Sequence, residues 1–305
     1  MSSQPRVSVI VPTRDRADLL LRAVQSVLRQ SFTDLEVLIC FDGAADEARG
    51  RVAALRGPVR LIELPPSGLP GRVRNGGLAE AGGELIAFLD DDDEWSPTRL
   101  ALQVALLDAS RDTGIVYTDA RLRYEDGSLS PPVLADRHKR GGALLDALID
   151  DCFIHPSTVL VRRTVLADAG GFDDDLPIAE DYDLWLRIAR VTRGACIAEP
   201  LATIGRSHAS SSGRRRRLAY ELSVRVLERA LARGMTPLQR LRCRRSLARL
   251  GTRAGFHALS EHDADAAAAF ARAALRHHPL HRPAWSLLWR SRNGGGGRQP
   301  TRNSV

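Results

Sequence analysis

The sequence predicts an α/β fold, in which a mostly parallel sheet carries helices on both faces and is followed by a C-terminal α-helical segment. Two observations lead to this prediction. Short apolar runs alternate with helical patterns over the first two thirds of the chain, and strand signals become rare after residue 213. Strands that alternate with helices are typical of a parallel sheet, because each connecting helix packs back onto it.

Four apolar strands and three helices are expected in the first ninety residues. The strands fall at 7–11, 35–41, 59–64 and 85–89, and the helices between them fall at 15–30, 44–55 and 72–81. In the first helix Leu20, Val24 and Val27 recur at the spacing that places apolar side chains on one face. Ligands of such sheets bind beyond the carboxyl ends of the strands, so the residues that follow each strand are the first candidates for a site.

The remaining chain is predicted to change from mixed to helical structure. A helix from Pro97 to about Ala109 precedes strands at 115–118, 120–124 and 156–161, and another helix begins at Glu180. Helices continue beyond Gly213 to about residue 289, and residues 254–275 resemble one tetratricopeptide-like helical hairpin. We therefore expect an α/β domain at 1–212, a basic α-helical domain at 213–292 and a disordered, Gly-rich tail at 293–305.

Charge is divided unevenly along the chain. Residues 1–205 hold 23 Lys and Arg against 32 Asp and Glu, whereas residues 206–305 hold 21 against 5. The acidic part suits a divalent cation, and the basic part suits an anionic lipid surface or an acidic partner. No apolar stretch reaches the roughly 18 residues that a membrane-spanning helix needs, so a cytoplasmic location is expected. The four cysteines lack CxxC spacing, which argues against a disulfide frame or a zinc site.

Four consecutive aspartates, Asp90–Asp93, follow the apolar strand at 85–89. Clustered carboxylates repel one another unless a cation binds, and oxygen ligands of this kind suit Mg²⁺ or Mn²⁺. A solvated acidic turn before a helix cap at Ser96 is the alternative interpretation. Because Asp42 also follows an apolar strand, carboxylates from two strand ends are expected to converge. Their convergence favours a metal and nucleotide site.

Other polar residues are candidates for the same site. Asp42 could accept a hydrogen bond from a nucleotide base, or it could form an Asx turn. Arg74, next to Asn75, could neutralise a pyrophosphate or organise the carboxylates around it. Glu180 and Asp181 lie with a third acid in the first turn of a predicted helix, where capping alone would need only one. A carboxylate in this position could deprotonate an acceptor hydroxyl.

His208 is the last candidate residue along the chain. It follows Arg206 and Ser207, and it could ligate a metal ion or contact a phosphate. The alternative is an isolated histidine with neither role.

Taken together, these motifs resemble glycosyltransferase family 2, a group of inverting enzymes with the GT-A fold. The resemblance covers about residues 6–210. The matching stretches are Val7–Thr13, Phe41–Gly43, Arg74–Gly76, Leu89–Asp93, Gly170–Phe172 and Glu180–Trp185.

The resemblance implies that the domain at 1–212 is catalytic and has a Rossmann-like GT-A fold. It would move a sugar from a nucleotide-sugar donor, first of all a UDP-sugar, to a hydroxyl of a glycan or lipid-linked acceptor. Such a reaction belongs to the synthesis of cell-envelope or surface polysaccharide or glycolipid.

The resemblance also implies a role for each candidate residue. Asp181 would be the catalytic base, with Glu180 beside it. The metal, Mn²⁺ or Mg²⁺, would be held by Asp92 and Asp90, with Asp92 as the most direct ligand. His208 is a candidate further ligand on its residue type and not on the resemblance. The residues expected to bind the donor are Pro12, Thr13, Arg14, Asp42, Arg74, Asn75, Asp90 and Asp91.

Two other functions are compatible with an acidic site on an α/β sheet. A metal-dependent nucleotidyltransferase would be expected to carry a Gly-rich phosphate loop after its first strand, where this chain has Pro12–Arg16 without glycine. A non-catalytic nucleotide- or metal-binding module would leave Glu180 and Asp181 unexplained.

The basic segment at 213–250 has two possible roles. Arginines interleaved with leucines predict either peripheral binding to an anionic membrane, at the inner face of the cell membrane, or packing of the leucines within the protein. Nucleic acid is not an expected partner, because the segment has few aromatic residues to stack on bases.

Overall fold

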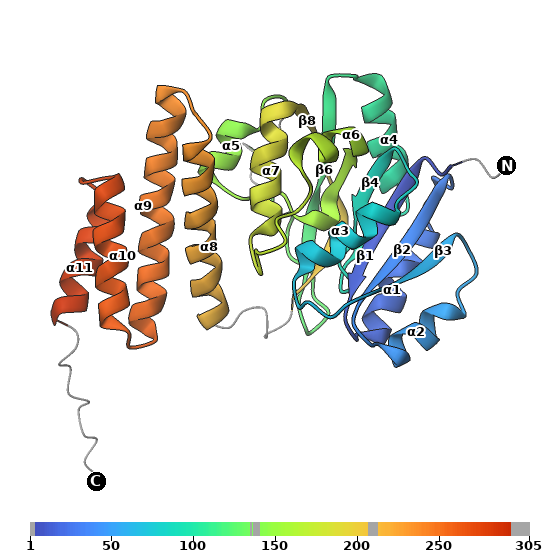
Figure 1. Cartoon of the computed structure of the whole chain (residues 1–305), viewed down its shortest axis with the longest axis horizontal. Helices are drawn as coiled ribbons and strands as arrows, with labels where there is room; N and C mark the ends of the chain where they lie inside the picture. The colour runs from blue at the N-terminus through green and yellow to red at the C-terminus, as the bar shows by residue number, and fades with distance from the viewer. Residues whose placement is uncertain (1–3, 135, 137–140, 207–212, 294–305) are drawn as a thin grey trace, which may run out of the picture. The chain divides into compact units, whose positions relative to one another are not determined.

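A computed structural model describes residues 4–134, 136, 141–206 and 213–293 (Figure 1). Contacts divide the chain into two compact units, Met1–Ser207 and His208–Val305. Residues 207–212, at the predicted domain boundary, and 294–305, in the predicted disordered tail, lie outside the described residues. The boundary and the tail therefore stay predictions.

The first unit is built on one eight-stranded sheet with the order β3-β2-β1-β4-β7-β6-β8-β5. Four of the seven pairings between the described strands are parallel, and those of β4 with β7, β6 with β7 and β5 with β8 are antiparallel. The predicted mostly parallel sheet is thus confirmed. The strands are β1 Val7–Thr13, β2 Leu35–Asp42, β3 Val59–Leu64, β4 Leu85–Phe88, β5 Glu94–Trp95, β6 Thr113–Arg123, β7 Val159–Arg162 and β8 Arg193–Gly205.

Helices cover both faces of this sheet, as predicted. Val7, Val9 and Val11 of β1 share a buried core with α1, α2 and α4. The other face of β1 and β2 carries α3, and α3 in turn contacts α7. The helices of this unit are α1 Ala17–Leu28, α2 Asp46–Ala53, α3 Pro70–Glu80, α4 Arg99–Ala109, α5 Leu145–Asp150, α6 Arg163–Ala169 and α7 Glu180–Val191.

A glycine allows α3 to pack close against the sheet. A Cβ atom on Gly77 would lie 2.6 Å from Ile10 Cγ2 of β1 and 2.8 Å from Cys40 Sγ of β2. Real side chains do not tolerate such distances, so a larger residue would push the helix away. Arg74 precedes Gly77 by about one helical turn, and the close packing therefore keeps Arg74 beside the sheet.

The register of the parallel strands places their carboxyl ends along one edge of the sheet. Thr13 at the end of β1 pairs with Phe41 of β2, and Ile10 of β1 pairs with Phe88 of β4. Asp42 ends β2, and the run that begins at Asp90 follows β4 by one residue. These are the strand ends from which a ligand site was predicted.

Several elements differ from the sequence prediction. The two strands expected at 115–118 and 120–124 are one strand, β6, whose pairing with β8 shifts register around Asp119. The strands β5 and β8 and the helices α5 and α6 were not predicted. β8 pairs through most of its length but carries Glu199-Pro200 at the register shift, so its sequence lacks the alternation that marks a strand.

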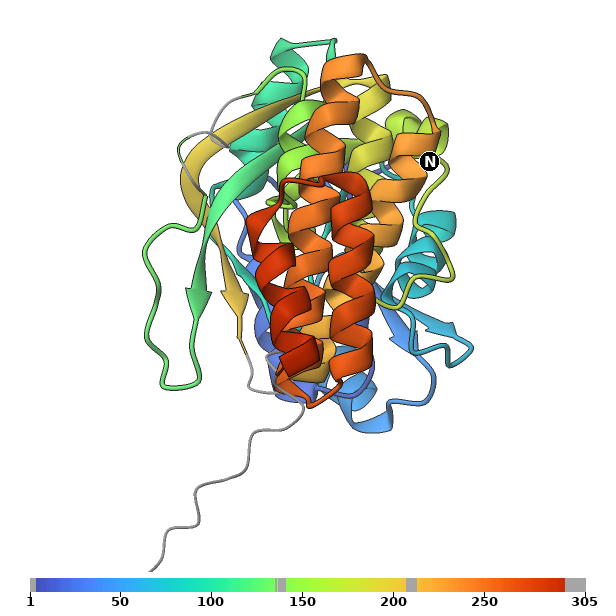
Figure 2. The ribbon, with the colours of Figure 1, turned by 90° about the vertical axis from the view of Figure 1, so that its left-hand side faces the viewer.

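The second unit is helical over its described part, which confirms the predicted C-terminal helical segment. The helices are α8 Gly213–Ala232, α9 Pro237–Ser260, α10 Ala264–His277 and α11 Arg282–Asn293. They lie side by side, with contacts between consecutive helices and between α9 and α11 (Figures 1 and 2). The predicted hairpin at 254–275 corresponds to the end of α9 and most of α10.

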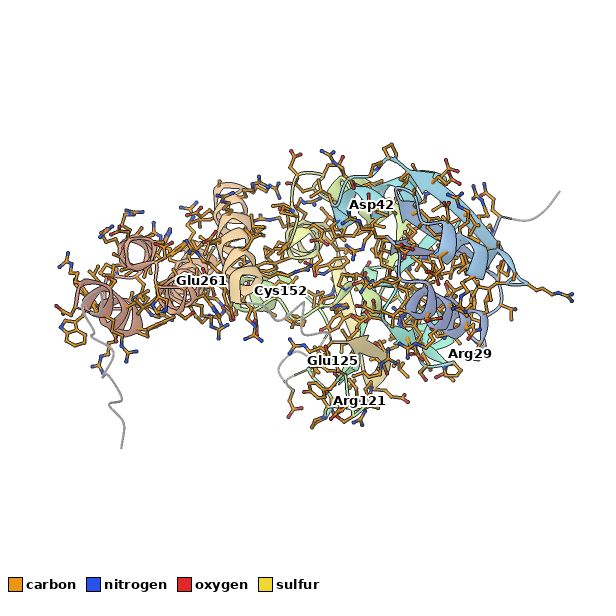
Figure 3. All side chains as sticks on the ribbon, turned by 90° about the horizontal axis from the view of Figure 1, so that it is seen from below. Arg29, Asp42, Arg121, Glu125, Cys152 and Glu261 are labelled. Carbon is orange, nitrogen blue, oxygen red and sulfur yellow. The ribbon has the colours of Figure 1, made fainter. Side chains whose placement is uncertain are left out.

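Side-chain bonds fix the ends of these helices. Thr236 and Gln239 form a reciprocal capping box at the start of α9, and the Asp263 carboxylate accepts the Ala266 N–H at the start of α10. Arg217 of α8 reaches the turn between α9 and α10, where it pairs with Glu261 at 3.1 Å and Asp263 at 2.9 Å (Glu261 is labelled in Figure 3). The turn is thereby held to α8.

Among the described residues, no helix combines the length and the apolar character needed to cross a membrane. All four cysteines lie in the described part of the chain, and none of them forms a disulfide there.

Candidate active site

The aspartates that follow β4 alternate between buried and accessible positions. Asp91 and Asp93 are each 1 % exposed. The side chains of Asp90 and Asp92 are 25 % and 26 % exposed. Two carboxylates are therefore available to a ligand from solvent, while the other two face internal partners.

Arg74 joins this run to the start of α7. Its Nη2 donates to Asp90 Oδ1 at 2.6 Å, and its Nη1 donates to Glu180 Oε1 at 2.7 Å. Arg74 is 3 % exposed and Glu180 is 7 % exposed. Burial alone would lower the pKa of Arg74, but the two carboxylates outweigh it and raise the pKa above its usual value. A permanent cation thus holds together two segments that are 90 residues apart in sequence.

Replacing Arg74 with methionine is expected to lower the free energy of unfolding by about 3–5 kcal/mol, because it leaves two carboxylates without their buried cation. Urea unfolding in the presence of a chelator measures the change. Arg72→Met on the same helix is the matched control, since Arg72 is half-exposed and pairs with the exposed Asp175 at 3.4 Å. Arg72→Met should lower the free energy of unfolding by no more than about 1 kcal/mol. Equal losses in the two variants would contradict the bridging role.

Thr13 and Arg16 bind the buried Asp91 from the end of β1. The Thr13 hydroxyl donates to Asp91 Oδ2 at 2.7 Å. Arg16 contacts Asp91 and donates from Nη1 to Asp92 Oδ2 at 2.8 Å. Burial raises the pKa of Asp91 to about 6, although Arg16 and Thr13 oppose the shift. Arg16 was not predicted as a site residue. The signal that could have identified it is its place just beyond the end of β1, where it is the second arginine after Arg14. Its side chain is more exposed than that of Arg74.

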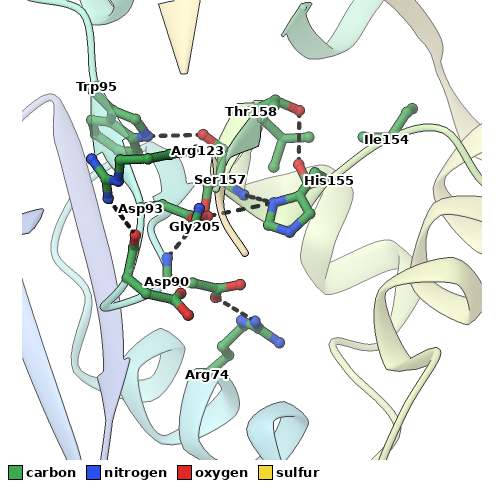
Figure 4. Close-up of polar contacts among 12 residues, drawn as sticks. Arg74, Asp90, Asp93, Trp95, Arg123, Ile154, His155, Ser157, Thr158 and Gly205 are labelled. Carbon is green, nitrogen blue, oxygen red and sulfur yellow. Dashed lines mark hydrogen bonds and ion pairs between the residues drawn. The ribbon is translucent and has the colours of Figure 1, made fainter. Parts of the chain in front are cut away.

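Asp93 lies in a second cluster, together with Asp90 and His155 (Figure 4). One oxygen of each carboxylate and one ring nitrogen of His155 lie within 4.8 Å of one another. Asp93 Oδ1 accepts the Gly205 N–H at 2.8 Å. Asp93 Oδ2 is buried, has no hydrogen-bond partner among the described residues, and lies 3.7 Å from His155 Nδ1.

The chemistry of this cluster fits a divalent cation. Burial and the charges of Asp90 and Asp92 raise the pKa of Asp93 well above its usual range. A cation would relieve that repulsion and would supply a partner for the unbonded Asp93 oxygen. Two carboxylates and one imidazole are ligands that Mn²⁺ accepts readily, and Mg²⁺ favours the carboxylates.

The close approach of β8 to the acidic run depends on a glycine. A Cβ atom on Gly205 would lie 2.5 Å from the Asp92 carbonyl oxygen. Without a side chain, the Gly205 backbone comes near enough to donate its N–H to Asp93. Arg123 of β6 also donates to the Asp92 carbonyl, at 3.0 Å. The ends of β6 and β8 therefore fix the backbone of the acidic run.

His155 is positioned by a short 3₁₀ turn at Pro156–Thr158. Its Nδ1 is 3.3 Å from the Ser157 N–H, and the Ser157 hydroxyl accepts the Asp90 N–H at 3.0 Å. The Trp95 indole N–H donates to the Ser157 carbonyl at 2.8 Å. His155 and Asp90 are thus held by the same residue, a coupling that the sequence did not indicate (Figure 4).

The start of α7 carries the predicted catalytic pair. Ala179, just before it, adopts a left-handed conformation with φ of 67°, which costs a non-glycine residue roughly 1 kcal/mol. Asp181 Oδ1 accepts the Tyr182 N–H at 2.7 Å. Burial and then the charge of Glu180 raise the pKa of Asp181 to about 6, against the opposing charges of His155 and Arg74. Strain and a raised pKa are both typical of catalytic positions.

Some predicted donor-binding residues hold loops in this structure. Asp42 accepts the N–H of Ser67 at 2.6 Å and that of Gly68 at 2.8 Å, so its carboxylate anchors the loop that leads into α3 (Asp42 is labelled in Figure 3). The Asn75 amide bonds to the backbone of Phe172 and to Asp174. A role for Asp42 or Asn75 in donor binding stays a prediction.

The remaining predicted residues occupy varied positions. Pro12 lies in β1 and pairs with Cys40, and Arg14 is exposed just beyond the strand. His208 lies outside the described residues. The structure thus brings together Thr13, Arg74, Asp90, Asp91, Asp92 and Glu180, and it adds Arg16, Asp93 and His155, which the sequence analysis did not select.

Comparison with known proteins gives the site a family context. A family model described as "Glycosyl transferase family 2" matches residues 8–169 of this chain. The match includes the whole acidic run, Arg74 and His155, and it ends before α7.

Two curated proteins illustrate the relatives. The succinoglycan biosynthesis protein ExoO of Rhizobium meliloti is 32 % identical over 209 residues, which cover 65 % of this chain and 59 % of that protein. An uncharacterized glycosyltransferase of Rickettsia felis is 30 % identical over 195 residues, which cover 61 % of this chain and 32 % of that protein. The chain therefore spans about a third of the Rickettsia relative and about three fifths of ExoO.

Solved structures show the same fold. S. aureus TarS 1-349 in complex with UDP-GlcNAc matches with a TM-score of 0.72 and 20 % identity, over 96 % of this chain and 93 % of that one. The mannosyltransferase PcManGT from Pyrobaculum calidifontis, in complex with GDP-Man and Mn²⁺, matches with a TM-score of 0.65 and 21 % identity, over 96 % of this chain and 81 % of that one. The predicted GT-A fold is thereby confirmed.

Proposed function

The chain belongs to glycosyl transferase family 2, and on that premise we propose that it is an inverting, cation-dependent transferase acting on a nucleotide-sugar. The observation that carries the proposal is the Arg74 bridge between Asp90 and Glu180, at 2.6 and 2.7 Å. It ties the carboxylates proposed to face the donor to the helix start that carries the proposed base, Asp181.

The donor would lie along the carboxyl ends of β1, β2 and β4. Pro12, Thr13, Arg14 and Asp42 are proposed to surround the base, and a UDP-sugar is the first candidate. Two neighbours support a nucleoside diphosphate sugar as the class of donor, since one is in complex with UDP-GlcNAc and the other with GDP-Man. Asp42 Oδ2 accepts one hydrogen bond, from the Gly68 N–H, and keeps a lone pair for a base, whereas Oδ1 already accepts two hydrogen bonds from Ser67.

Asp90, Asp93 and His155 are proposed to hold Mn²⁺ or Mg²⁺, and Asp92 is proposed to complete the site when the donor binds. His208 stays a predicted further ligand. The cation would supply charge neutralisation for the departing diphosphate. Arg16, half-exposed and paired with Asp92, offers a guanidinium that could shift to a phosphate oxygen.

Asp181 is proposed to take the proton of the acceptor hydroxyl. The acceptor oxygen would form a bond to the anomeric carbon as the bond from that carbon to the diphosphate oxygen breaks. One such displacement inverts the anomeric configuration. A pKa near 6 makes Asp181 a stronger base than an ordinary aspartate, yet leaves it ionised at neutral pH.

We propose a glycan or lipid-linked acceptor in the synthesis of surface polysaccharide or glycolipid, and a cytoplasmic location. One relative is a succinoglycan biosynthesis protein, which supports a polysaccharide as the product. The relatives extend beyond the part that this chain matches, so this assignment rests on the shared domain alone.

A panel of nucleotide-sugars, screened by thermal unfolding with Mn²⁺, tests the proposed function. At a concentration 100 times its Kd, a true donor should stabilise the protein by about 2.7 kcal/mol, because it binds only the folded state. The same donor should then be hydrolysed slowly without an acceptor. Stabilisation by nucleoside triphosphates alone would favour a nucleotidyltransferase. Stabilisation by a donor that is never cleaved would favour a binding module.

A further inference from the structure

The outer side of α11 exposes large apolar side chains that no described residue covers. Trp285 is 55 % exposed and Trp289 is 66 % exposed, and their spacing of four residues places both on one side of the helix. Leu280, in the turn before α11, is 83 % exposed. We call Leu280, Trp285 and Trp289 the α11 face.

This exposure does not result from loose packing of α11. Ala284, Leu287 and Leu288 point inward and are buried in clusters shared with α9 and α10. The Trp285 indole N–H donates to the Pro279 carbonyl at 2.8 Å, which fixes the ring on the surface. In Figure 1 α11 is the last helix of its unit, and α10 and α9 follow it in the row.

Two exposed arginines lie on the same side of α11 as its tryptophans. The last acidic residue of the chain is Asp265, and the forty residues after it contain seven arginines and no Asp, Glu or Lys. Arg282 and Arg292 are exposed on α11, seven and three residues from Trp289 and therefore on the same side of the helix. An apolar surface that contains two tryptophans and is flanked by Arg282 and Arg292 is complementary to an anionic interface.

The segment 213–250, which the sequence suggested as a membrane-binding segment, buries most of its large apolar side chains. Leu222, Val226, Leu227 and Leu247 are at most 4 % exposed. Among the larger apolar side chains of this segment, those of Leu218, Leu238 and Leu241 are the exposed ones. Most of its leucines are therefore not available to a lipid surface, whereas the tryptophans of α11 are.

We propose that the α11 face binds an anionic lipid membrane. Tryptophan favours the boundary between headgroups and acyl chains, because its ring is apolar and its N–H is polar. Arg282 and Arg292 would lie at the level of the anionic headgroups. The proposal does not depend on the chemistry at Asp181, since the face belongs to the other unit of the chain.

Intrinsic fluorescence can report the contact directly. The chain has four tryptophans, and the other two, Trp95 and Trp185, are 5 % and 1 % exposed. Vesicles of phosphatidylglycerol and phosphatidylcholine should shift the emission of the full chain to shorter wavelength, and brominated acyl chains should quench it. Vesicles of phosphatidylcholine alone should do neither, and added salt should weaken the effect.

Paired variants locate the surface. Trp285→Ser with Trp289→Ser should weaken co-sedimentation with the anionic vesicles by about tenfold or more, because both interfacial anchors are lost. Leu238→Ser with Leu241→Ser, from the segment at 213–250, is the matched control and should bind like the wild type. Donor hydrolysis should be unchanged in both, because neither pair lies in the catalytic unit.

Three results would overturn the proposal. The first is equal vesicle binding by the wild type and the tryptophan variant, which would move the contact elsewhere. The second is no binding by the wild type at low salt. The third is self-association of the wild type in sedimentation velocity, lost in the tryptophan variant and without vesicle binding, which would make the α11 face an interface between copies of the chain.

Discussion

Replacing Asp181 with asparagine is expected to lower turnover about 10²–10⁴-fold, the usual contribution of a positioned general base. Asparagine has nearly the same shape and can still accept the Tyr182 N–H at the start of α7. It cannot take a proton from the acceptor hydroxyl. Donor affinity, measured by calorimetry with Mn²⁺ present, should stay close to that of the wild type, because Asp181 is assigned to the acceptor side.

The pH dependence of the wild type gives an independent check on the same residue. A base must be deprotonated to act, and the pKa of Asp181 is raised to about 6 by burial and by Glu180. Turnover should therefore be level above pH 6 and fall about tenfold per pH unit below it. In Asp181→Asn the residual activity should lose this acidic limb.

Asp183, in the same helical turn, is the matched control for Asp181. Its carboxylate pairs with Arg187 at 2.7 Å and is 4 % exposed, so it stabilises α7 from inside. Asp183→Asn should reduce the free energy of unfolding and leave turnover within a few fold of the wild type. If donor affinity fell as much as turnover in Asp181→Asn, Asp181 would belong to the donor site and the assignment as base would be wrong.

The parts of the fold that the sequence predicted share a simple cause. β1, β2 and β4 are buried on both faces, so each is a largely apolar run, interrupted only by Ser8 in β1 and Glu36 in β2, and stands out without any tertiary information. β8 is a strand because it pairs with β6 and β5, and its sequence alternates poorly and contains a proline. Tertiary pairing determined that element, and local sequence did not reveal it.

The residues of the candidate site likewise fall into those that local sequence revealed and those that depend on tertiary structure. Asp90–Asp92 and Glu180-Asp181 were predicted as site residues because clustered acids at an element end are unusual in themselves. His155 was not, because it is a single histidine whose meaning depends on the fold bringing β7 beside β4. The sequence left open whether Arg74 contacts a pyrophosphate or the carboxylates, because its partners come from distant segments. In the fold its Nη1 donates to Glu180 and its Nη2 donates to Asp90.

Activity is expected to require a divalent cation and to fall about 10²-fold or more in Asp92→Asn, because a metal typically contributes several kcal/mol of charge stabilisation. Asp92 is the accessible carboxylate outside the Asp90, Asp93 and His155 cluster. We therefore expect the variant to keep its fold and its response to the cation alone. Chelator should abolish activity in the wild type, and Mn²⁺ should restore it.

Asp93→Asn and His155→Ala separate the preformed part of the site from Asp92. Without donor, Mn²⁺ should raise the melting temperature of the wild type and of Asp92→Asn, but not of these two variants. In chelator, the melting temperature of Asp93→Asn should be no lower than that of the wild type. Burial and the neighbouring aspartates raise the pKa of Asp93, which means that its charge is unfavourable in the fold, and asparagine removes that charge. Asp15 is an exposed carboxylate beyond β1, and Asp15→Asn is the control that should change neither readout.

Full activity of the wild type in chelator would contradict the metal requirement. An unaltered Mn²⁺ response in Asp93→Asn would instead favour the ligands predicted from the sequence, Asp90, Asp92 and His208.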